Sequence, residues 1–395
     1  MKYYIIAGEA SGDLHGSNLM KGIYSKDPEA VIRFWGGDMM LQVWKAHKDN
    51  GNGGLVQHYK KSAVMGFVEV LAMAGRLLNN LRFCKKDILD FNPDCVILID
   101  YPGFNFRIAE FAHKHGYKVF YYIAPKVWAS REGRNRKLRR DVDRLYIIFP
   151  FEIPYFESKN IPYIYRGNPL VDAVDGSTAM NESREDFLGR NNLENRKIIA
   201  MLAGSRKSEI STMMPVLVSF AIKMHCTAGY ENYQFLIAGA PSRSIEDYAK
   251  YIPEECASYI KVLFSQTQSI VRQAEAAVVN SGTASLETVL LGTPQVVGFI
   301  MGSSLTYLIA KHIVKVKYIS LGNLIVNKLA FKEFIQDDCN PDALVTEVRA
   351  LIEDKAYRNR MLEDYAEIRE RLGGQGASEA VAASMIDELK SSVQQ

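Results

Sequence analysis

The chain has 395 residues, of which 48% are hydrophobic and 24% charged, a balance typical of a globular protein with ample core. Its length favours two domains, and its formal net charge of +3 is too small for a general nucleic-acid-binding protein. The five cysteines are scattered without a CxxC pair, which argues against a zinc site or a disulfide framework and favours a reducing cytosol.

Short apolar runs alternate with helical patterns in both halves of the chain, which favours parallel sheets with helices on both faces. The runs that predict strands are 3–7, 31–35, 95–99, 118–123, 144–149, 197–202, 234–238, 260–264, 276–280 and 295–299. The expected domains are 1–172 and 197–345, joined by a polar linker at 173–196 and followed by a C-terminal helical segment at 346–395. The helices expected near the C-terminus are 342–371, after the start signal Asn340-Pro341, and 376–390. The sequence therefore predicts an α/β protein with two Rossmann-like, doubly wound domains and a ligand cleft between them.

The first strand runs into Ala7-Gly8-Glu9-Ala10-Ser11-Gly12-Asp13. Glycines at 8 and 12 permit a tight turn from strand to helix, which would place Glu9 and Ser11 at the cleft. The spacing is not GxGxxG, so a dinucleotide-binding fingerprint is missing. An ordinary loop between a strand and a helix is the alternative interpretation.

Asp100 directly follows the apolar strand predicted at 95–99. A carboxylate at the end of a buried strand lies at the rim of the cleft, where partial burial would raise its pKa and suit it to act as a general base. Aspartate also caps turns frequently, so a structural role for Asp100 is the alternative.

Two further stretches of the first half have an unusual composition. The segment 64–83 is strongly apolar, which predicts either a buried helix or a lip that accepts acyl chains or dips into a membrane surface; 304–317 has a similar character. Eight cations lie between Lys126 and Arg144, and they form either a solvated face or a site for an anionic headgroup or phosphate. Arginines flank the Asp141-Val142-Asp143 sequence within this cluster, which argues against a metal site there.

In the second half, Gly204-Ser205-Arg206 follows the first predicted strand and begins a helix. An arginine in this position offers a fixed cation whose fork can bind two phosphate oxygens. A surface pair between Arg206 and Glu209 is the alternative.

The strand at 276–280 is followed by a turn of small residues, Ser281-Gly282-Thr283-Ala284, and then by a helix that Ser281 or Thr283 is expected to cap. The free N–H groups of such a turn, at the positive end of the helix dipole, predict a phosphate site. Glu287 lies one turn further along, where its carboxylate could bind the two hydroxyls of a ribose. An ordinary turn with a surface glutamate is the alternative.

These motifs together resemble those of lipid-A-disaccharide synthase, a family of inverting glycosyltransferases with the two-domain GT-B fold. The matching pieces run through nearly the whole chain in the family's order, as AGEASGD at 7–13, AVMGFVEVL at 63–71, IDYPGFN at 99–105, APKVWA at 124–129, FPFE at 149–152, GSRKSEI at 204–210, SGTASLE at 281–287 and YISLGNLI at 318–325. The chain departs from the family at Gly103, where a second aspartate is frequent, and at Ala203, where proline is frequent.

The resemblance implies a hexosyltransferase that moves 2,3-diacylglucosamine from UDP-2,3-diacylglucosamine to the 6-hydroxyl of 2,3-diacylglucosamine 1-phosphate. The products are UDP and the β-1,6-linked tetraacyl-disaccharide 1-phosphate, and neither a metal nor a cofactor is expected. The resemblance also implies a Gram-negative bacterium as the source and peripheral attachment to the phospholipid surface on the cytoplasmic face of its inner membrane. A homodimer with exchanged C-terminal elements is a further implication.

Within this reaction, Asp100 is the expected general base and Glu9 a second catalytic candidate. The expected substrate-binding residues are Ser11, Gly12, Met65, Glu69 and Asn105 in the first half, and Arg206, Glu209, Ser281, Gly282, Thr283, Ala284 and Glu287 in the second.

Two other interpretations stay open. One is another GT-B enzyme, either a UDP-sugar epimerase or a transferase acting on a different lipid acceptor; the other is a non-catalytic UDP-sugar sensor. The apolar 64–83 segment favours a lipid acceptor, and Asp100 at a strand end favours an enzyme.

Overall fold

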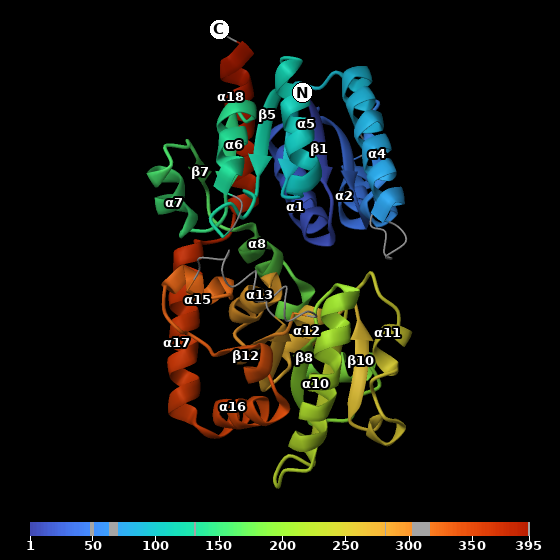
Figure 1. The fold of residues 1–395 in the computed structure, drawn as a ribbon, viewed down its shortest axis with the longest axis vertical. Helices are drawn as coiled ribbons and strands as arrows, with labels where there is room; N and C mark the ends of the chain where they lie inside the picture. The colour runs from blue at the N-terminus through green and yellow to red at the C-terminus, as the bar shows by residue number, and fades with distance from the viewer. Residues whose placement is uncertain (48–50, 63–69, 130–131, 281, 302–316, 394–395) are drawn as a thin grey trace. The chain divides into compact units, whose positions relative to one another are not determined.

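The computed structural model describes residues 1–47, 51–62, 70–129, 132–280, 282–301 and 317–393. The chain divides into two compact units, each built on one parallel sheet (Figure 1). Unit 1 comprises Met1–Ala173 and Leu372–Gln395, and unit 2 comprises Val174–Arg371. The prediction of two doubly wound α/β domains is confirmed.

Unit 1 contains a seven-stranded sheet in the order β3-β2-β1-β4-β5-β6-β7, in which every neighbouring pair is parallel. The strands are β1 (Lys2–Ala7), β2 (Val31–Gly36), β3 (Gly54–His58), β4 (Cys95–Ile99), β5 (Lys118–Tyr122), β6 (Arg144–Ile147) and β7 (Ile164–Tyr165). All of β4, and β1 after Lys2, are buried. Central strands covered on both faces have continuous apolar sequences, which is why the apolar runs predict them well.

Helices cover both faces of this sheet (Figure 1). The longer ones are α1 (Ala10–Lys26), α2 (Asp38–His47), α4 (Val70–Phe91), α5 (Pro102–Lys114) and α18 (Ala377–Val393), and the short ones are α3 (Tyr59–Ser62), α6 (Asn135–Asp141), α7 (Glu152–Ser158) and α8 (Pro169–Asp175). One layer consists of α1 with α2 and α18 against it, and the other consists of α4, α5 and α6 in succession.

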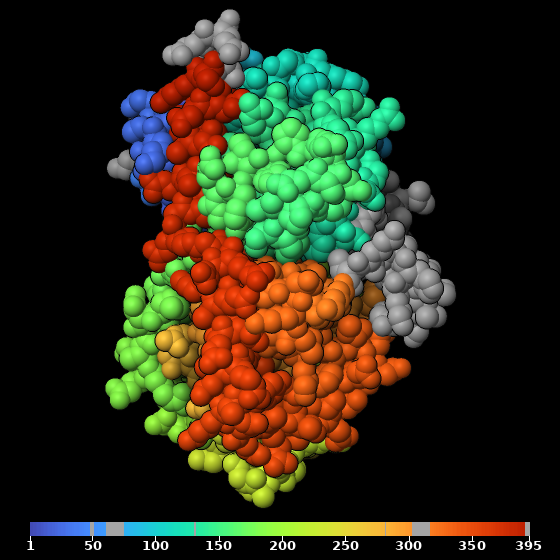
Figure 2. Space-filling model, turned by 90° about the vertical axis from the view of Figure 1, so that its left-hand side faces the viewer, coloured from blue at the N-terminus to red at the C-terminus, as the bar shows by residue number. Residues whose placement is uncertain are grey.

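The last helix, α18, belongs to unit 1 although it ends the chain. It packs on α1. Figure 2 shows it in red on the surface of this unit, beside residues from the start of the chain (blue) and residues from the part of unit 1 that precedes unit 2 (green). Asp172 accepts hydrogen bonds at its start from the N–H groups of Gly376 and Ser378, at 2.6 and 2.8 Å. The helices within 346–395 are thus divided between the two units, and their exchange between protomers stays a prediction.

Unit 2 contains a six-stranded parallel sheet in the order β10-β9-β8-β11-β12-β13. Its strands are β8 (Lys197–Leu202), β9 (Tyr233–Gly239), β10 (Ile260–Phe264), β11 (Ala276–Asn280), β12 (Gln295–Phe299) and β13 (Glu333–Ile335). Its helices are α9 (Arg184–Arg190), α10 (Lys207–His225), α11 (Glu246–Ala249), α12 (Thr267–Arg272), α13 (Thr283–Leu291), α15 (Leu321–Val326), α16 (Pro341–Glu353) and α17 (Lys355–Leu372). Contacts join α10 to α11 and α16, whereas α13 contacts α12 and α15.

The helix expected at 342–371 is two helices, so this prediction is wrong in detail. The backbone of Asp354 is extended between α16 and α17, and its carboxylate accepts from the N–H of Tyr357 at 2.9 Å, which begins the second helix. The start signal itself is confirmed, because Asn340 caps α16 by accepting from the Ala343 N–H at 3.0 Å and Pro341 is the first helical residue. Among the helices of the described residues, none is long and apolar enough to cross a membrane.

Candidate active site

In both sheets the strand order reverses between two central neighbours, β1 and β4 in unit 1 and β8 and β11 in unit 2. The carboxyl ends of strands at such a reversal are where open α/β sheets bind ligands. The turns that follow these four strands contain Gly8, Asp100, Arg206 and Gly282. The motifs singled out in the sequence therefore stand at the reversal point of each sheet.

Asp100 is half-buried and lies in an unusual turn at the end of β4. Its φ is +43° and that of Tyr101 is +45°, a left-handed conformation that L-residues other than glycine rarely adopt. The carbonyl oxygen of Asp100 accepts from the Tyr121 hydroxyl at 2.6 Å and from the Asn105 amide at 2.8 Å. The turn thus holds the backbone of the expected base firmly at the strand end.

Asn105, expected among the substrate-binding residues, is fully buried beneath this turn. Its amide nitrogen also donates to the Ile99 carbonyl at 3.2 Å, so the side chain supports the backbone of the turn from within the protein. The structure thereby gives Asn105 a structural role in place of the expected contact with substrate.

The turn after β1 places Glu9 and Ser11 on the surface, as expected for residues that line a binding site. Gly12 is buried, and a Cβ there would lie 3.1 Å from that of Ala7, so this glycine serves the packing of α1 on the strand. Asp13, the last residue of the motif, is also buried. Its carboxylate accepts from three backbone N–H groups at the start of α2, those of Gly37, Met39 and Met40, at 2.7 to 3.1 Å.

The turn after β8 of unit 2 touches the last residue of β11. The Asn280 amide donates to the Ala203 carbonyl at 3.2 Å, and a Cβ on Gly204 would lie 2.6 Å from that same amide nitrogen. Gly204 has a φ of +101°, which suits glycine. Arg206 is the N-cap residue of α10 and directly follows this turn. Its closeness to the small-residue turn at 281–284 stays a prediction.

The Arg206 guanidinium lies 2.8 Å from the Glu209 carboxylate, and the arginine side chain is 64% exposed. Glu209 also accepts from the N–H groups of Ser205 and Arg206, at 2.9 and 3.1 Å, and so caps α10. The structure therefore contains the surface pair between Arg206 and Glu209 that was the alternative interpretation, and the Glu209 carboxylate also accepts hydrogen bonds at the start of α10. An exposed pair of this kind contributes little to stability, so the arginine can exchange its partner for a phosphate.

Gly282 is the N-cap residue of α13, with a φ of +150°. As a glycine it has no side chain that could cap the first turn of the helix. The expectation that Thr283 caps the helix is wrong, because Thr283 is its first residue; Ser281 lies outside the described residues. A Cβ on Gly282 would meet nothing within 4 Å. Among the described residues, a side chain at Gly282 would therefore meet open space at the start of α13, and the phosphate site at Thr283 and Ala284 stays a prediction.

Glu287 is half-buried one turn into α13. Its carboxylate accepts from the Gln268 amide at 2.7 Å, and burial raises its pKa above the ordinary value for glutamate. The neighbouring amide opposes this rise because it stabilises the charged form. A carboxylate fixed in this way is suited to accept hydrogen bonds from ribose hydroxyls. Two other candidates, Met65 and Glu69, lie outside the described residues.

Glu152 is a buried acid of the FPFE motif for which no functional role was predicted. It is 1% exposed and accepts from the N–H groups of Ile148 and Phe149 and from the indole of Trp128, at 3.0 to 3.2 Å. Burial outweighs these three bonds and raises its pKa to about 7. The signal that could have found it is an acid next to two aromatic residues after an apolar strand.

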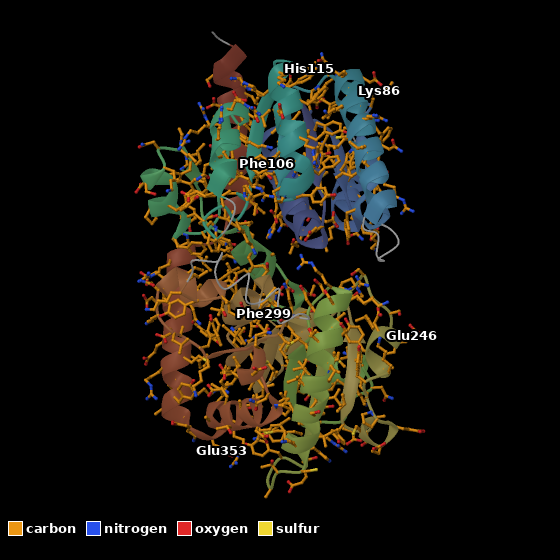
Figure 3. The ribbon with its side chains drawn as sticks, viewed as in Figure 1. Lys86, Phe106, His115, Glu246, Phe299 and Glu353 are labelled. Carbon is orange, nitrogen blue, oxygen red and sulfur yellow. The ribbon has the colours of Figure 1, made fainter. Side chains whose placement is uncertain are left out.

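The basic cluster between Lys126 and Arg144 is partly neutralised in the structure. Arg140 bonds the buried Asp141 at 2.7 Å, which agrees with the rejection of a metal site at 141–143. Arg134 and Lys137 lie over the ring of Phe106 on α5, 5.7 and 5.9 Å from its centre (Figure 3). The solvated-face interpretation accounts for most of this cluster.

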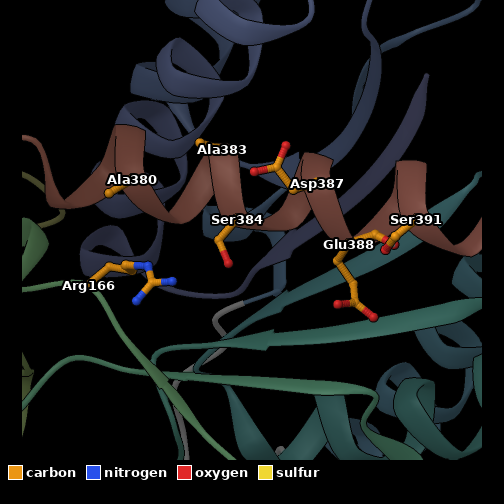
Figure 4. Close-up of a pocket in the computed structure, with 7 residues that line it drawn as sticks. All are labelled: Arg166, Ala380, Ala383, Ser384, Asp387, Glu388 and Ser391. Carbon is orange, nitrogen blue, oxygen red and sulfur yellow. The ribbon is translucent and has the colours of Figure 1, made fainter.

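An open groove of unit 1 runs along α18, and none of the expected site residues lines it (Figure 4). Its lining consists of Arg166, Ala380, Ala383, Ser384, Asp387, Glu388 and Ser391. Glu388 forms an ion pair at 2.7 Å with Arg144, the first residue of β6, and so joins the helix to the start of this strand.

Comparison with known proteins assigns the chain to a family. A family model described as lipid-A-disaccharide synthetase matches residues 3–385. The chain belongs to this family. The lipid-A-disaccharide synthase of Trichlorobacter lovleyi is 35% identical over 389 residues, which are 98% of this chain and 97% of that protein. That of Geobacter metallireducens is 34% identical over 388 residues, again 98% of this chain and 96% of its own. The resemblance read from the motifs is confirmed, and with it the enzyme class, a glycosyltransferase.

Solved structures share the fold at low sequence identity. UDP-GlcNAc 2-epimerase from Neisseria meningitidis, bound to UDP-GlcNAc, has a TM-score of 0.68 at 14% identity and covers 98% of this chain and 100% of its own. UDP-GlcNAc 2-epimerase from Methanocaldococcus jannaschii, in complex with UDP-GlcNAc and UDP, has a TM-score of 0.65 at 13% identity, with 98% and 99% covered. Likeness at this identity concerns the fold alone, so it does not favour the epimerase alternative.

Proposed function

We propose that this protein is a lipid-A-disaccharide synthase that transfers 2,3-diacylglucosamine from its UDP conjugate to the 6-hydroxyl of 2,3-diacylglucosamine 1-phosphate. The main support for the roles of individual residues is their position in the fold. Asp100, Arg206 and Gly282 all follow strands at which a sheet reverses its order. The proposed nucleotide-binding turns belong to unit 2, and the proposed base belongs to unit 1.

In the proposed step, the 6-hydroxyl oxygen of the acceptor attacks the anomeric carbon of the donor. Asp100 takes the hydroxyl proton, and the bond between the anomeric carbon and the diphosphate oxygen breaks with its electrons leaving on UDP. The first turn of α13 and the Arg206 guanidinium stabilise the charge that develops on the diphosphate. Glu287 binds the ribose hydroxyls, and Glu9 and Ser11 line the acceptor side.

The test of these roles separates binding from turnover. Asp100→Asn keeps the shape of the side chain but removes its basicity, so turnover should fall by about a hundredfold or more while the Kd for UDP stays at the wild-type value. Asp342→Asn, at a side chain that is 78% exposed on α16, is the matched control and should keep full turnover. Near-normal turnover of Asp100→Asn would refute the general-base role.

Arg206→Ala should weaken UDP binding and turnover together, because the guanidinium is proposed to contact the diphosphate in both the bound and the reacting state. Arg349→Ala removes another exposed arginine of unit 2, one that pairs with Glu353 at 3.1 Å (Figure 3), and should change neither quantity. Unchanged UDP binding in Arg206→Ala would refute the contact with the diphosphate. The only role left for this arginine would then be at the N-cap of α10.

The lipid substrates imply contact with a membrane surface, and α4 offers a face for it. Leu78, Phe83 and Leu89 of this helix are 44 to 54% exposed, and they are three of the six large apolar side chains that are exposed among the described residues. Four cations, Arg76, Arg82, Lys85 and Lys86, lie on the same helix. Apolar and basic side chains together favour peripheral attachment to anionic phospholipid, proposed here for the cytoplasmic face of the inner membrane.

Flotation with vesicles tests this attachment. The wild-type protein should float with vesicles that contain phosphatidylglycerol, and the Leu78→Ser/Phe83→Ser variant should float less at the same salt concentration. Ile245→Ser, at a residue of unit 2 that is 44% exposed, is the matched control. Equal flotation of the double variant and the control would contradict a role for α4 in membrane contact.

A further inference from the structure

Two consecutive residues after β4 adopt a left-handed conformation without being glycine. Asp100 and Tyr101 have φ values of +43° and +45°. Aspartate tolerates this region of backbone space moderately well, whereas tyrosine is rare in it. Such strain persists only where the surroundings enforce it, and it gathers at functional sites.

Buried side chains of unit 1 enforce this conformation from beneath. The Tyr121 hydroxyl donates to the Asp100 carbonyl at 2.6 Å, a short bond from a side chain that is fully buried in β5. The Asn105 amide donates to the same carbonyl at 2.8 Å and to that of Ile99 at 3.2 Å. The Asp100 N–H in turn donates to the Tyr122 carbonyl at 3.1 Å. Every backbone polar group of Asp100 is therefore bonded, which fixes the direction in which its side chain leaves the backbone.

The ring of Tyr101 is held by the first motif of the chain. A Cβ on Gly8 would lie 2.3 Å from two atoms of this ring, so the ring covers Gly8 and only glycine fits there. The ring also stacks on Phe104, with centres 5.5 Å apart. The turn after β1 and the turn after β4 are thus interlocked, although Gly8 and Tyr101 are 93 positions apart in the sequence.

Tyr121 itself is oriented by a neighbour on α5. The ring of Phe106 packs against it with centres 5.6 Å apart, and Phe106 is 4% exposed (Figure 3). The hydroxyl therefore has little freedom to leave the Asp100 carbonyl.

We infer that Tyr121 is a positioning residue for the Asp100 carboxylate, and that the strained turn is kept because it aims this carboxylate at the acceptor hydroxyl. The inference rests on the proposed function, in which Asp100 is the general base. Tyr121 does not touch the substrate; it acts through the backbone of Asp100. Gly8 serves the same end from the other side, because it admits the Tyr101 ring.

Tyr121→Phe removes one hydroxyl and leaves the buried ring in place. We expect turnover to fall about tenfold, with the KM for the UDP-sugar unchanged, because a small displacement of a catalytic group lowers the rate steeply. Tyr146→Phe is the matched control, since Tyr146 is a fully buried tyrosine of β6 whose hydroxyl faces Ser384 at 3.4 Å and not Asp100. Equal turnover in the two phenylalanine variants would overturn the inference.

A double variant separates positioning from general loss of structure. If Tyr121 acts only through the Asp100 carboxylate, Asp100→Asn/Tyr121→Phe should be no slower than Asp100→Asn alone. A further loss of the same factor in the double variant would mean that Tyr121 acts elsewhere, and it would overturn the inference with Asp100 still the base. Near-normal turnover of Asp100→Asn would instead refute the proposed role of Asp100, and the inference with it.

A second pair of variants tests the turn from the side of Gly8. Gly8→Ala should lower turnover as Tyr121→Phe does, because the new methyl group displaces the Tyr101 ring. Gly103→Ala is the control, since a Cβ at Gly103 meets nothing within 4 Å. Turnover of Gly8→Ala equal to that of Gly103→Ala would contradict the interlocked turn.

Discussion

Glu152 should make the stability of unit 1 depend on pH near neutrality. Its carboxyl is buried, and its pKa rises from 4.5 to about 7 because burial penalises the charged form more than three hydrogen bonds favour it. The nearby Lys126 ammonium lowers this pKa slightly. Between the two pKa values the folded chain holds a proton that the unfolded chain has lost.

Because the folded state binds more protons in this window, the unfolding free energy falls as the pH rises from about 4.5 to about 7. The contribution of Glu152 should decrease by about 2–3 kcal/mol between about pH 5 and pH 8, since one unit of pKa difference corresponds to about 1.4 kcal/mol. Glu152→Gln is uncharged at every pH and lacks this dependence. Its amide has one oxygen where the carboxylate has two, so its NH2 group faces at least one of the three donors. This adds a destabilisation that does not change with pH.

Urea unfolding followed by tryptophan fluorescence measures this directly, because all three tryptophans, Trp35, Trp44 and Trp128, lie in unit 1. The difference in unfolding free energy between the wild type and Glu152→Gln should shrink with rising pH by the amount given above. Glu157→Gln, at an exposed residue of the same helix α7, is the control and should follow the wild type. A difference that stays constant across this pH range would refute the argument.

Two other substitutions have outcomes that the structure predicts. Gly204→Ala should destabilise unit 2 by more than about 1 kcal/mol and weaken UDP binding, as calorimetry can show, because the φ of +101° and the contact with Asn280 both exclude a Cβ; Gly189→Ala, where a Cβ meets nothing within 4 Å, should not. Arg33→Met should lower the unfolding free energy of unit 1 by about 3 kcal/mol in the fluorescence assay, because it leaves the buried Asp87 carboxylate without the guanidinium that bonds it at 2.6 Å. Unchanged stability of either variant would contradict the corresponding argument.

The central strands could be predicted from the sequence because burial on both faces makes each of them one apolar run. The strands that the sequence analysis missed lie at the edges or are very short. β7 has two residues, both half-buried, and β3 includes polar residues among its five. An edge strand is covered less completely, so its sequence lacks the apolar signal.

Some features of the candidate site could likewise be predicted from the sequence, and others could not. Asp100 and the turn around Gly282 could be predicted because a polar residue or a small-residue turn directly after an apolar strand is visible in one short window. The left-handed pair at 100–101 could not, because Tyr101 is not a residue type that favours it. Its cause lies in Tyr121 on the neighbouring strand β5 and in Gly8 in the turn after β1. The burial of Glu152 could not be predicted for a similar reason, because it depends on which distant parts of the chain pack against this side chain.

The most direct test of the account is UDP release from UDP-2,3-diacylglucosamine in detergent micelles with EDTA, measured with and without 2,3-diacylglucosamine 1-phosphate. We expect rapid release only when the acceptor is present, in step with formation of a tetraacyl-disaccharide 1-phosphate. UDP release that does not depend on this acceptor, or the absence of a disaccharide product, would contradict the assignment.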